Sequence, residues 1–156
     1  MTILGKIAQN AKEHPDRIAY VDNYIAKNQL VSNTISWREL DEKSGKLARY
    51  LNDRLISNKP VIVYGHKNPL MIVCFLACAK CGRAYVPIDQ SLPIGRTKEI
   101  IDSVNPEIIL STELLELFDN RIFDADSMKQ AMDTSSTVIS SDQWIEIGRA
   151  SCRERV

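Results

Sequence analysis

The sequence predicts an α/β fold in which a β-hairpin precedes a βαβαβ parallel sheet flanked by helices. Strand and helix patterns alternate from residue 60 to residue 111, which is typical of parallel strands joined by helical crossovers. The segments 61–64 and 107–110 are apolar on both faces, as expected of strands covered by helices on each side. With 156 residues, the chain is long enough for one ordinary core and leaves little room for a second domain.

The N-terminal elements are predicted from periodicity and turn signals. Residues 3–12 carry apolar side chains at helical spacing, and Pro15 ends this short amphipathic helix. Two β-rich segments follow at 17–24 and 30–37, separated by a polar turn that contains Lys27 and Asn28. These segments predict the hairpin.

A long helix is predicted from Trp37 to Leu55. Ser36 and Glu39 fit the capping box, in which the two side chains satisfy amides of the first helical turn. The apolar face of the helix and its charged face follow helical spacing, and we interpret the charged residues as a solvated face. The apolar face is Leu40, Leu47, Tyr50, Leu51 and Leu55, and the charged residues are Arg38, Asp41, Glu42, Lys43, Lys46 and Arg49.

The βαβαβ unit is predicted to comprise strands at 61–65, 84–88 and 107–111 and helices at 69–82 and 93–104. Pro69 and Pro93 are placed where the first helical turn tolerates a residue without an amide hydrogen. Beyond Thr112 the signals weaken. The segment 112–118 is compatible with one or two helical turns, 121–132 is ambiguous, and 134–143 is expected to be a polar linker rich in Ser and Thr.

Composition excludes several classes of function. Twenty Lys and Arg residues balance twenty Asp and Glu residues, so nothing in the net charge favours nucleic acid or an anionic membrane as a partner. We find no apolar run of 18 residues and no signal-peptide pattern at the N-terminus. We therefore predict a cytoplasmic protein with no membrane insertion.

The motif Cys78-Ala-Lys-Cys81 has the spacing of a redox pair or half of a zinc site. Redox pairs of this spacing usually open a helix, whereas Gly82 indicates that this pair closes one. No second such motif and no histidine lies nearby in the sequence. We predict that both cysteines are packing residues.

His66 and Asp89 each follow a predicted strand of the sheet, where open α/β sheets bind ligands. His66 could act in catalysis, or it could bond a turn or cap the next helix, but no nucleophile can be assigned to it. Asp89 is expected to cap the turn from Ser91 to Pro93. The sequence contains neither GxxxxGK[ST] nor GxGxxG, so we predict no catalytic, cofactor-binding or metal-binding residue in this chain.

Two motifs resemble those of the adenylate-forming ligases. Residues 78–96 (CAKCGRAYVPIDQSLPIGR) are similar to a signature written approximately LKAG-x-AYVPLD followed by P-x-x-R, with Cys81 in place of the usual Ala. Residues 35–40 (ISWREL) are similar to an earlier motif of the superfamily. Residues 64–82 most resemble the D-alanine:D-alanyl carrier protein ligases, and 140–145 (SSDQWI) resembles the segment before their phosphate loop.

The resemblance implies that the chain is the N-terminal part of the large domain of a ligase that uses ATP and Mg²⁺. The implied reaction forms D-alanyl-AMP from D-alanine and transfers the alanine to the phosphopantetheine thiol of D-alanyl carrier protein, for lipoteichoic acid. In this family the phosphate loop and catalytic Lys lie downstream, so residues 1–145 are expected to be an inactive fragment that binds no cofactor. Residues 146–156 resemble a translated sequencing adapter and are interpreted as a non-native tail. Two alternatives stay open: a fragment of a peptide-synthetase adenylation domain, and a free-standing α/β module without catalytic activity.

Overall fold

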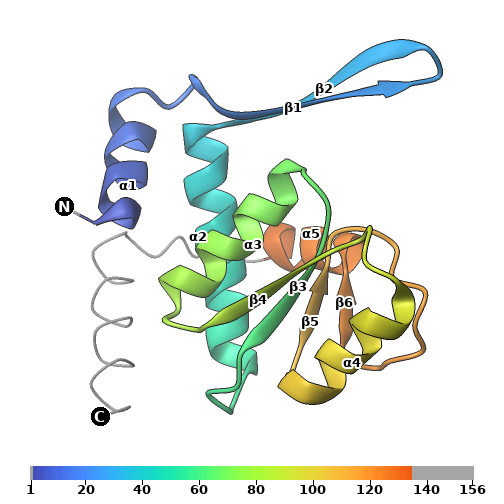
Figure 1. The fold of residues 1–156 in the computed structure, drawn as a ribbon. Helices are drawn as coiled ribbons and strands as arrows, with labels where there is room; N and C mark the ends of the chain where they lie inside the picture. Colours follow the sequence, from blue (N-terminus) through green and yellow to red (C-terminus); the bar gives the residue numbers. More distant parts are fainter. Residues whose placement is uncertain (1, 135–156) are drawn as a thin grey trace.

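The computed structural model describes residues 2–134, which form five helices and six strands (Figure 1). The N-terminal part comprises α1 (Ile3–Glu13), β1 (Ile18–Ala26), β2 (Gln29–Ser36) and α2 (Trp37–Arg54). The rest comprises β3 (Val61–Gly65), α3 (Pro69–Lys80), β4 (Tyr85–Asp89), α4 (Ile94–Val104), β5 (Ile109–Ser111), β6 (Ile122–Asp124) and α5 (Ala125–Thr134).

The strands form two sheets, and both predicted sheets are confirmed. Strands β1 and β2 pair antiparallel, and their turn residues Lys27 and Asn28 both have positive φ, as a tight hairpin turn requires. The second sheet is parallel throughout, with the strand order β4-β3-β5-β6. The first strand of this sheet therefore lies inside it, with β4 on one side and β5 on the other.

Several details differ from the sequence predictions beyond residue 104. The ambiguous segment 121–132 forms a fourth parallel strand, β6, followed directly by α5, and the segment 112–118 contains no helix. Thr134, expected to begin a linker, is the last residue of α5. The remaining linker residues, the segment 140–145 and the interpreted tail 146–156 lie outside the described residues.

The predicted capping box at the start of α2 is confirmed. The Ser36 hydroxyl accepts a hydrogen bond from the Glu39 amide at 3.2 Å, and the Glu39 carboxylate accepts one from the Ser36 amide at 2.9 Å. The charged face of α2 is less solvated than predicted. Asp41 accepts a hydrogen bond from the Lys80 ammonium of α3 at 2.8 Å, and the Lys80 side chain is only 4% exposed. This pair joins two helices that also share the core.

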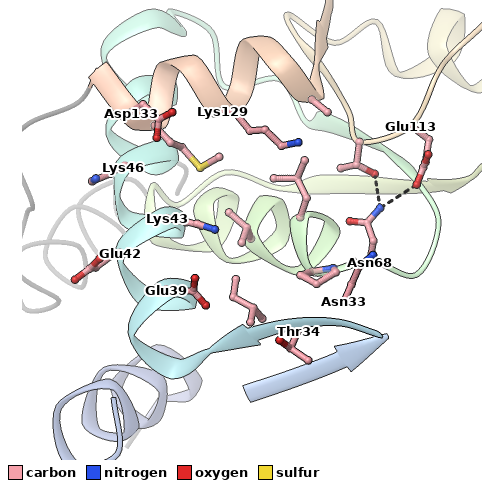
Figure 2. A pocket seen from close by; sticks show the side chains of 17 residues that line it. Asn33, Thr34, Glu39, Glu42, Lys43, Lys46, Asn68, Glu113, Lys129 and Asp133 are labelled. Carbon is pink, nitrogen blue, oxygen red and sulfur yellow. Dashed lines mark hydrogen bonds between the residues drawn. The ribbon is translucent and has the colours of Figure 1, made fainter. Parts of the chain in front are cut away.

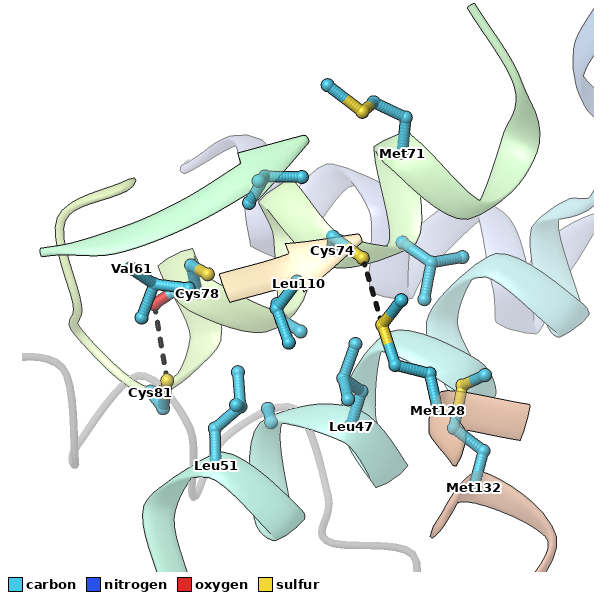
Figure 3. Packing of buried hydrophobic residues seen from close by; sticks show 14 of the residues in the cluster. Leu47, Leu51, Val61, Met71, Cys74, Cys78, Cys81, Leu110, Met128 and Met132 are labelled. Carbon is cyan, nitrogen blue, oxygen red and sulfur yellow. Dashed lines mark hydrogen bonds between the residues drawn. The ribbon is translucent and has the colours of Figure 1, made fainter. Parts of the chain in front are cut away.

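The core has two parts, one on each face of the parallel sheet. On one face α2, α3 and α5 cover a cluster that includes Leu47, Leu51, Val63, Leu110 and Met128 (Figure 3). On the other face α4 covers a second cluster: Ile62, Tyr64, Ile88, Ile101, Ile109 and Leu115. Consecutive residues of β3 thus enter opposite clusters, which explains why this strand is apolar throughout. Over residues 2–134, none of the helices is long and apolar enough to cross a membrane.

Candidate functional site

The parallel sheet reverses its winding between β3 and β5. Helix α3, which follows β3, packs on one face, and α4, which precedes β5, packs on the other. The segments that leave the carboxyl ends of β3 and β5 therefore border a crevice, the place where open α/β sheets bind ligands. We call the edge formed by these carboxyl ends the carboxyl edge.

A cavity of about 590 Å³ opens at this crevice (Figure 2). Its walls are β2, α2, the start of α3, the end of β5 and α5. Asn68 lies at the junction: its amide nitrogen donates to the Thr112 hydroxyl at 3.3 Å and to the Glu113 carboxylate at 3.2 Å. The Asn68 carbonyl oxygen accepts from the Met71 amide at 2.9 Å and so caps α3. Both N–H groups of this amide and one acceptor site of its oxygen are therefore used within the protein.

Charged side chains of both signs line the cavity. Three ammonium groups and four carboxylates contribute, from Lys43, Lys46, Lys129, Glu39, Glu42, Glu113 and Asp133. The hydrogen bond from the Ser36 amide lowers the pKa of Glu39, so this carboxylate is ionised at neutral pH. Three of these charges, Glu42, Lys43 and Lys46, lie on the face of α2 that the sequence predicts to be solvated. Glu42 and Lys43 are exposed there, as predicted, and the structure shows in addition that this face borders a cavity. The balance of signs provides no strong field for a polyphosphate.

The structure brings the sequence candidates His66 and Asp89 together. His66 Nδ1 lies 3.0 Å from Asp89 Oδ2, and both side chains are about half exposed. Asp89 also accepts from the Ser91 amide at 2.8 Å, so its predicted turn-capping role is confirmed. The Ser91 hydroxyl and amide, followed by His66, lower the pKa of Asp89 to about 2. Sequence reasoning missed this pairing, because it depends on β3 and β4 being neighbours: Gly65 and Asp89 are partners in the parallel register, which brings His66 beside Asp89.

A second cavity, of about 410 Å³, adjoins this pair. Its lining combines the polar His66 and Asp89 with the apolar Tyr20, Met71 and Phe75. Among the described residues that line it, none is Ser, Thr or Cys, and the hydroxyl present is the phenol of Tyr20, whose pKa is raised by burial and by the charge of Asp22. His66 therefore has no aliphatic hydroxyl or thiol nucleophile to activate here. The arrangement is a hydrogen-bonded pair that closes a turn.

A profile of the AMP-binding enzyme family matches residues 7–153. The chain belongs to this family. The match confirms the family expected from the two sequence motifs, and it extends into the segment interpreted as a non-native tail, an interpretation that stays a prediction.

Curated members of the AMP-binding enzyme family are similar to this chain. The D-alanine--D-alanyl carrier protein ligase of Listeria welshimeri is 37% identical over 116 residues, which is 73% of this chain and 21% of the relative. The ligase of the same name from Staphylococcus epidermidis is 48% identical over 81 residues, 52% of this chain and 16% of the relative. The chain thus spans about a fifth of the length of the curated relatives it matches.

Solved structures of adenylation enzymes share the fold. The N-terminal subdomain of Klebsiella oxytoca NpsA superposes with a TM-score of 0.61 at 20% identity, covering 88% of this chain and 35% of that one. VinN in complex with 3-methylaspartate gives a TM-score of 0.70 at 14% identity, covering 89% and 40%. These matches support the predicted fold class.

Metal ligands and reactive thiols are the other candidates for chemistry in this chain. Over residues 2–134 there is no cluster of three or more His, Cys, Asp or Glu side chains that could hold a metal ion. Cys78 and Cys81 are free thiols, buried at the end of α3. Burial raises the pKa of Cys78 well above its usual value and raises that of Cys81 to about 11. These thiols are protonated at neutral pH, which suits packing residues.

Proposed function

We propose that this chain is the N-terminal portion of a cytoplasmic ligase that activates D-alanine with ATP to D-alanyl-AMP. The ligase then transfers the alanine to the phosphopantetheine thiol of D-alanyl carrier protein, in the synthesis of lipoteichoic acid. The observation that carries the proposal is the 37% identity over 116 residues to a D-alanine--D-alanyl carrier protein ligase. The shorter match at 48% identity supports the same substrate.

Within this ligase, we assign a scaffolding role to residues 1–145 and propose no catalytic, cofactor-binding or metal-binding residue among them. The crevice at the carboxyl edge supports this assignment, because Asn68 spends its hydrogen bonds on Met71, Thr112 and Glu113. ATP and Mg²⁺ would be held by residues that the longer relatives supply elsewhere in their chains. Residues 146–156 are proposed to be foreign to the ligase.

The peptide-synthetase alternative has weaker support. The adenylation structures named above are 20% and 14% identical to this chain, so they support its fold and carry no information on its amino-acid substrate.

The proposal is tested with the full-length enzyme from the source gene by amino-acid-dependent exchange of pyrophosphate into ATP. We expect exchange with D-alanine and much less with L-alanine. Exchange that depends on a different amino acid would overturn the substrate assignment. Sequencing the gene past codon 145 tests the tail, because a genomic stop directly after Val156 would contradict the assignment of residues 146–156.

The 156-residue chain itself provides the second test. We expect isothermal calorimetry with ATP and Mg²⁺ to show no saturable binding, because the described residues provide no array of phosphate donors. Saturable micromolar binding that is lost in His66→Ala or Asp89→Ala would mean that the carboxyl edge is a nucleotide site.

A further inference from the structure

The β1–β2 hairpin extends beyond the body of the molecule (Figure 1). Cross-strand partners lie on the same side of a sheet, and so do residues two apart along a strand. The observed register therefore places three partner pairs on one face, which we call the uncharged hairpin face. Its residues are Val21 and Thr34, Asn23 and Ser32, and Ile25 and Leu30.

The apolar residues of this face are open to solvent. Ile25 is 76% exposed, Leu30 is 73% exposed and Val21 is 47% exposed. A two-stranded hairpin is marginally stable by itself, and a solvated strand usually carries charged side chains that prevent association. The six residues of this face carry no charge, although 26% of the whole chain is charged. This composition is that of a buried face.

The polar groups of the face also suit burial. The Ser32 hydroxyl donates to the Asn23 side-chain oxygen at 2.6 Å, so the donor of Ser32 and one acceptor site of Asn23 are used within the hairpin, while the amide nitrogen of Asn23 can donate to a group that covers the face. At the base of the hairpin, Thr34 also lines the crevice cavity (Figure 2). Asn33, on the opposite face, lines the same cavity, so the base of the hairpin as a whole borders it. The uncharged hairpin face and this cavity together offer more contact area than the hairpin alone.

We propose that the uncharged hairpin face is the docking surface for the rest of the ligase chain, the part that lies outside this structure. The inference rests on the proposed function in one respect, namely that the chain is part of a longer ligase. The relatives support this occupant, because the match covers only 21% of one ligase and 16% of another, and in those ligases the remaining residues belong to the same chain. A segment on the same chain reaches the face at a far higher effective concentration than a second copy does.

The test compares thermal unfolding of the full-length ligase with that of the 156-residue chain. The test variant is Ile25→Lys with Leu30→Lys, and the matched control is Gln29→Lys, an exposed position whose side chain lies on the other face of the hairpin. In the full-length enzyme we expect the double variant to lower Tm by about 5 °C or more, because two unpaired ammonium groups would be buried. The control should leave Tm unchanged. In the 156-residue chain both variants should leave Tm nearly unchanged.

Other outcomes identify other occupants. Equal Tm for the full-length enzyme and its double variant would overturn the proposal. A 156-residue chain that is dimeric in sedimentation and becomes monomeric in the double variant, with no effect in the full-length enzyme, would assign the face to a second copy. Binding of the full-length enzyme to vesicles of anionic phospholipid, lost in the double variant, would assign it to a lipid surface.

Two measurements on the full-length enzyme separate this proposal from the proposed function. Pyrophosphate exchange by the unsubstituted full-length enzyme decides which amino acid is activated, whereas the Tm difference decides what covers the hairpin. A ligase that activates another amino acid can still show the Tm difference. A ligase that activates D-alanine but shows no Tm difference contradicts the docking surface alone.

Discussion

The two edges of the parallel sheet use their polar residues differently. At the edge where the strands begin, which we call the amino edge, Glu107 accepts from the backbone amides of Ile56 and Ser57, both at 2.9 Å. Arg83 donates to the carbonyl oxygens of Leu55 and Ser57. At the carboxyl edge, His66 and Asp89 bond each other and remain half exposed beside a cavity.

This difference shows which polar residues stabilise the fold. At the amino edge, charged side chains fix the backbone of the connection from α2 to β3, so their loss releases a loop. At the carboxyl edge the exposed pair fixes one short turn, and the tight packing there comes from backbone proximity at Gly65 instead. Charged side chains therefore stabilise the amino edge, whereas close packing around Gly65 stabilises the carboxyl edge.

The largest effect is expected from Gly65→Ala at the carboxyl edge. A Cβ atom at this position would lie 1.9 Å from the hydroxyl oxygen of Thr112, which is buried and bonded to the Tyr64 carbonyl. We expect a loss of about 2 kcal/mol in the free energy of unfolding, because the neighbours must shift. Gly95→Ala is the control: its Cβ would meet nothing within 4 Å, so stability should stay equal or rise. If both variants unfold at the same urea concentration, close packing around Gly65 does not contribute to stability, and the prediction is wrong.

The next effect is expected from Glu107→Ala at the amino edge. The loss leaves the Ile56 and Ser57 amides without their carboxylate, and we expect about 1–2 kcal/mol lower stability at pH 7. The hydrogen bonds from the Ile56 amide and from Ser57 lower the pKa of Glu107 from 4.5 to about 2. A lowered folded-state pKa stabilises the protein above pH 4.5, and this contribution disappears as the pH falls toward 2. The stability difference between wild type and variant should therefore shrink over that range in urea titrations.

The reactivity of the Cys81 thiol measures local opening of the amino edge, where we expect a smaller effect. Cys81 is buried, its pKa is raised to about 11 by burial, and Arg83 lies close to it. In a Cys152→Ser background, we expect the native chain to react with Ellman's reagent only slowly at pH 8, and Glu107→Ala to increase the rate several-fold. Rapid reaction of the unaltered background protein would contradict the assignment of Cys78 and Cys81 as packing residues.

The smallest effect is expected from Asp89→Asn at the carboxyl edge. Asp89 and His66 are both about half exposed, and exposed polar pairs contribute little, so we expect a change below about 1 kcal/mol in the free energy of unfolding at pH 7, measured in urea. Because the pKa of Asp89 is lowered to about 2, even this small contribution should vanish as the pH falls from 3.8 toward 2. A loss as large as that of Gly65→Ala would show that charge also holds this edge.

The sequence predicted the sheet well because its strands are marked by composition. β3 is flanked by turn residues and is apolar throughout, and Ser36 with Glu39 marks the start of α2 by direct bonding. β6 was missed because it has only three residues and α5 begins directly after it. The segment therefore shows neither the alternation of a strand nor the 3.6-residue spacing of a helix over its whole length. Tertiary pairing with β5 decides that segment.

The candidate site was less predictable than the sheet. His66 and Asp89 could be placed at strand ends, but their pairing depends on which strands are neighbours. The cavity at the crevice depends on α2 and α5 converging, and the charges of Lys43 and Lys129 are 86 positions apart in the sequence. The spacing of charges along α2 alone does not indicate that α5 packs beside it.

Sulfur atoms of α3 and α5 meet in the core, and this has a chemical consequence. Cys74 and Met128 lie 3.6 Å apart between their sulfur atoms, with Met132 and Cys78 in the same cluster (Figure 3). While the chain is folded, burial shields these atoms from peroxide. Once it opens, a sulfoxide on Met128 would place a polar, branched group at a position that is completely buried in the native packing. A chain oxidised at Met128 would then not refold to the native packing, so oxidation in the unfolded state would make unfolding irreversible.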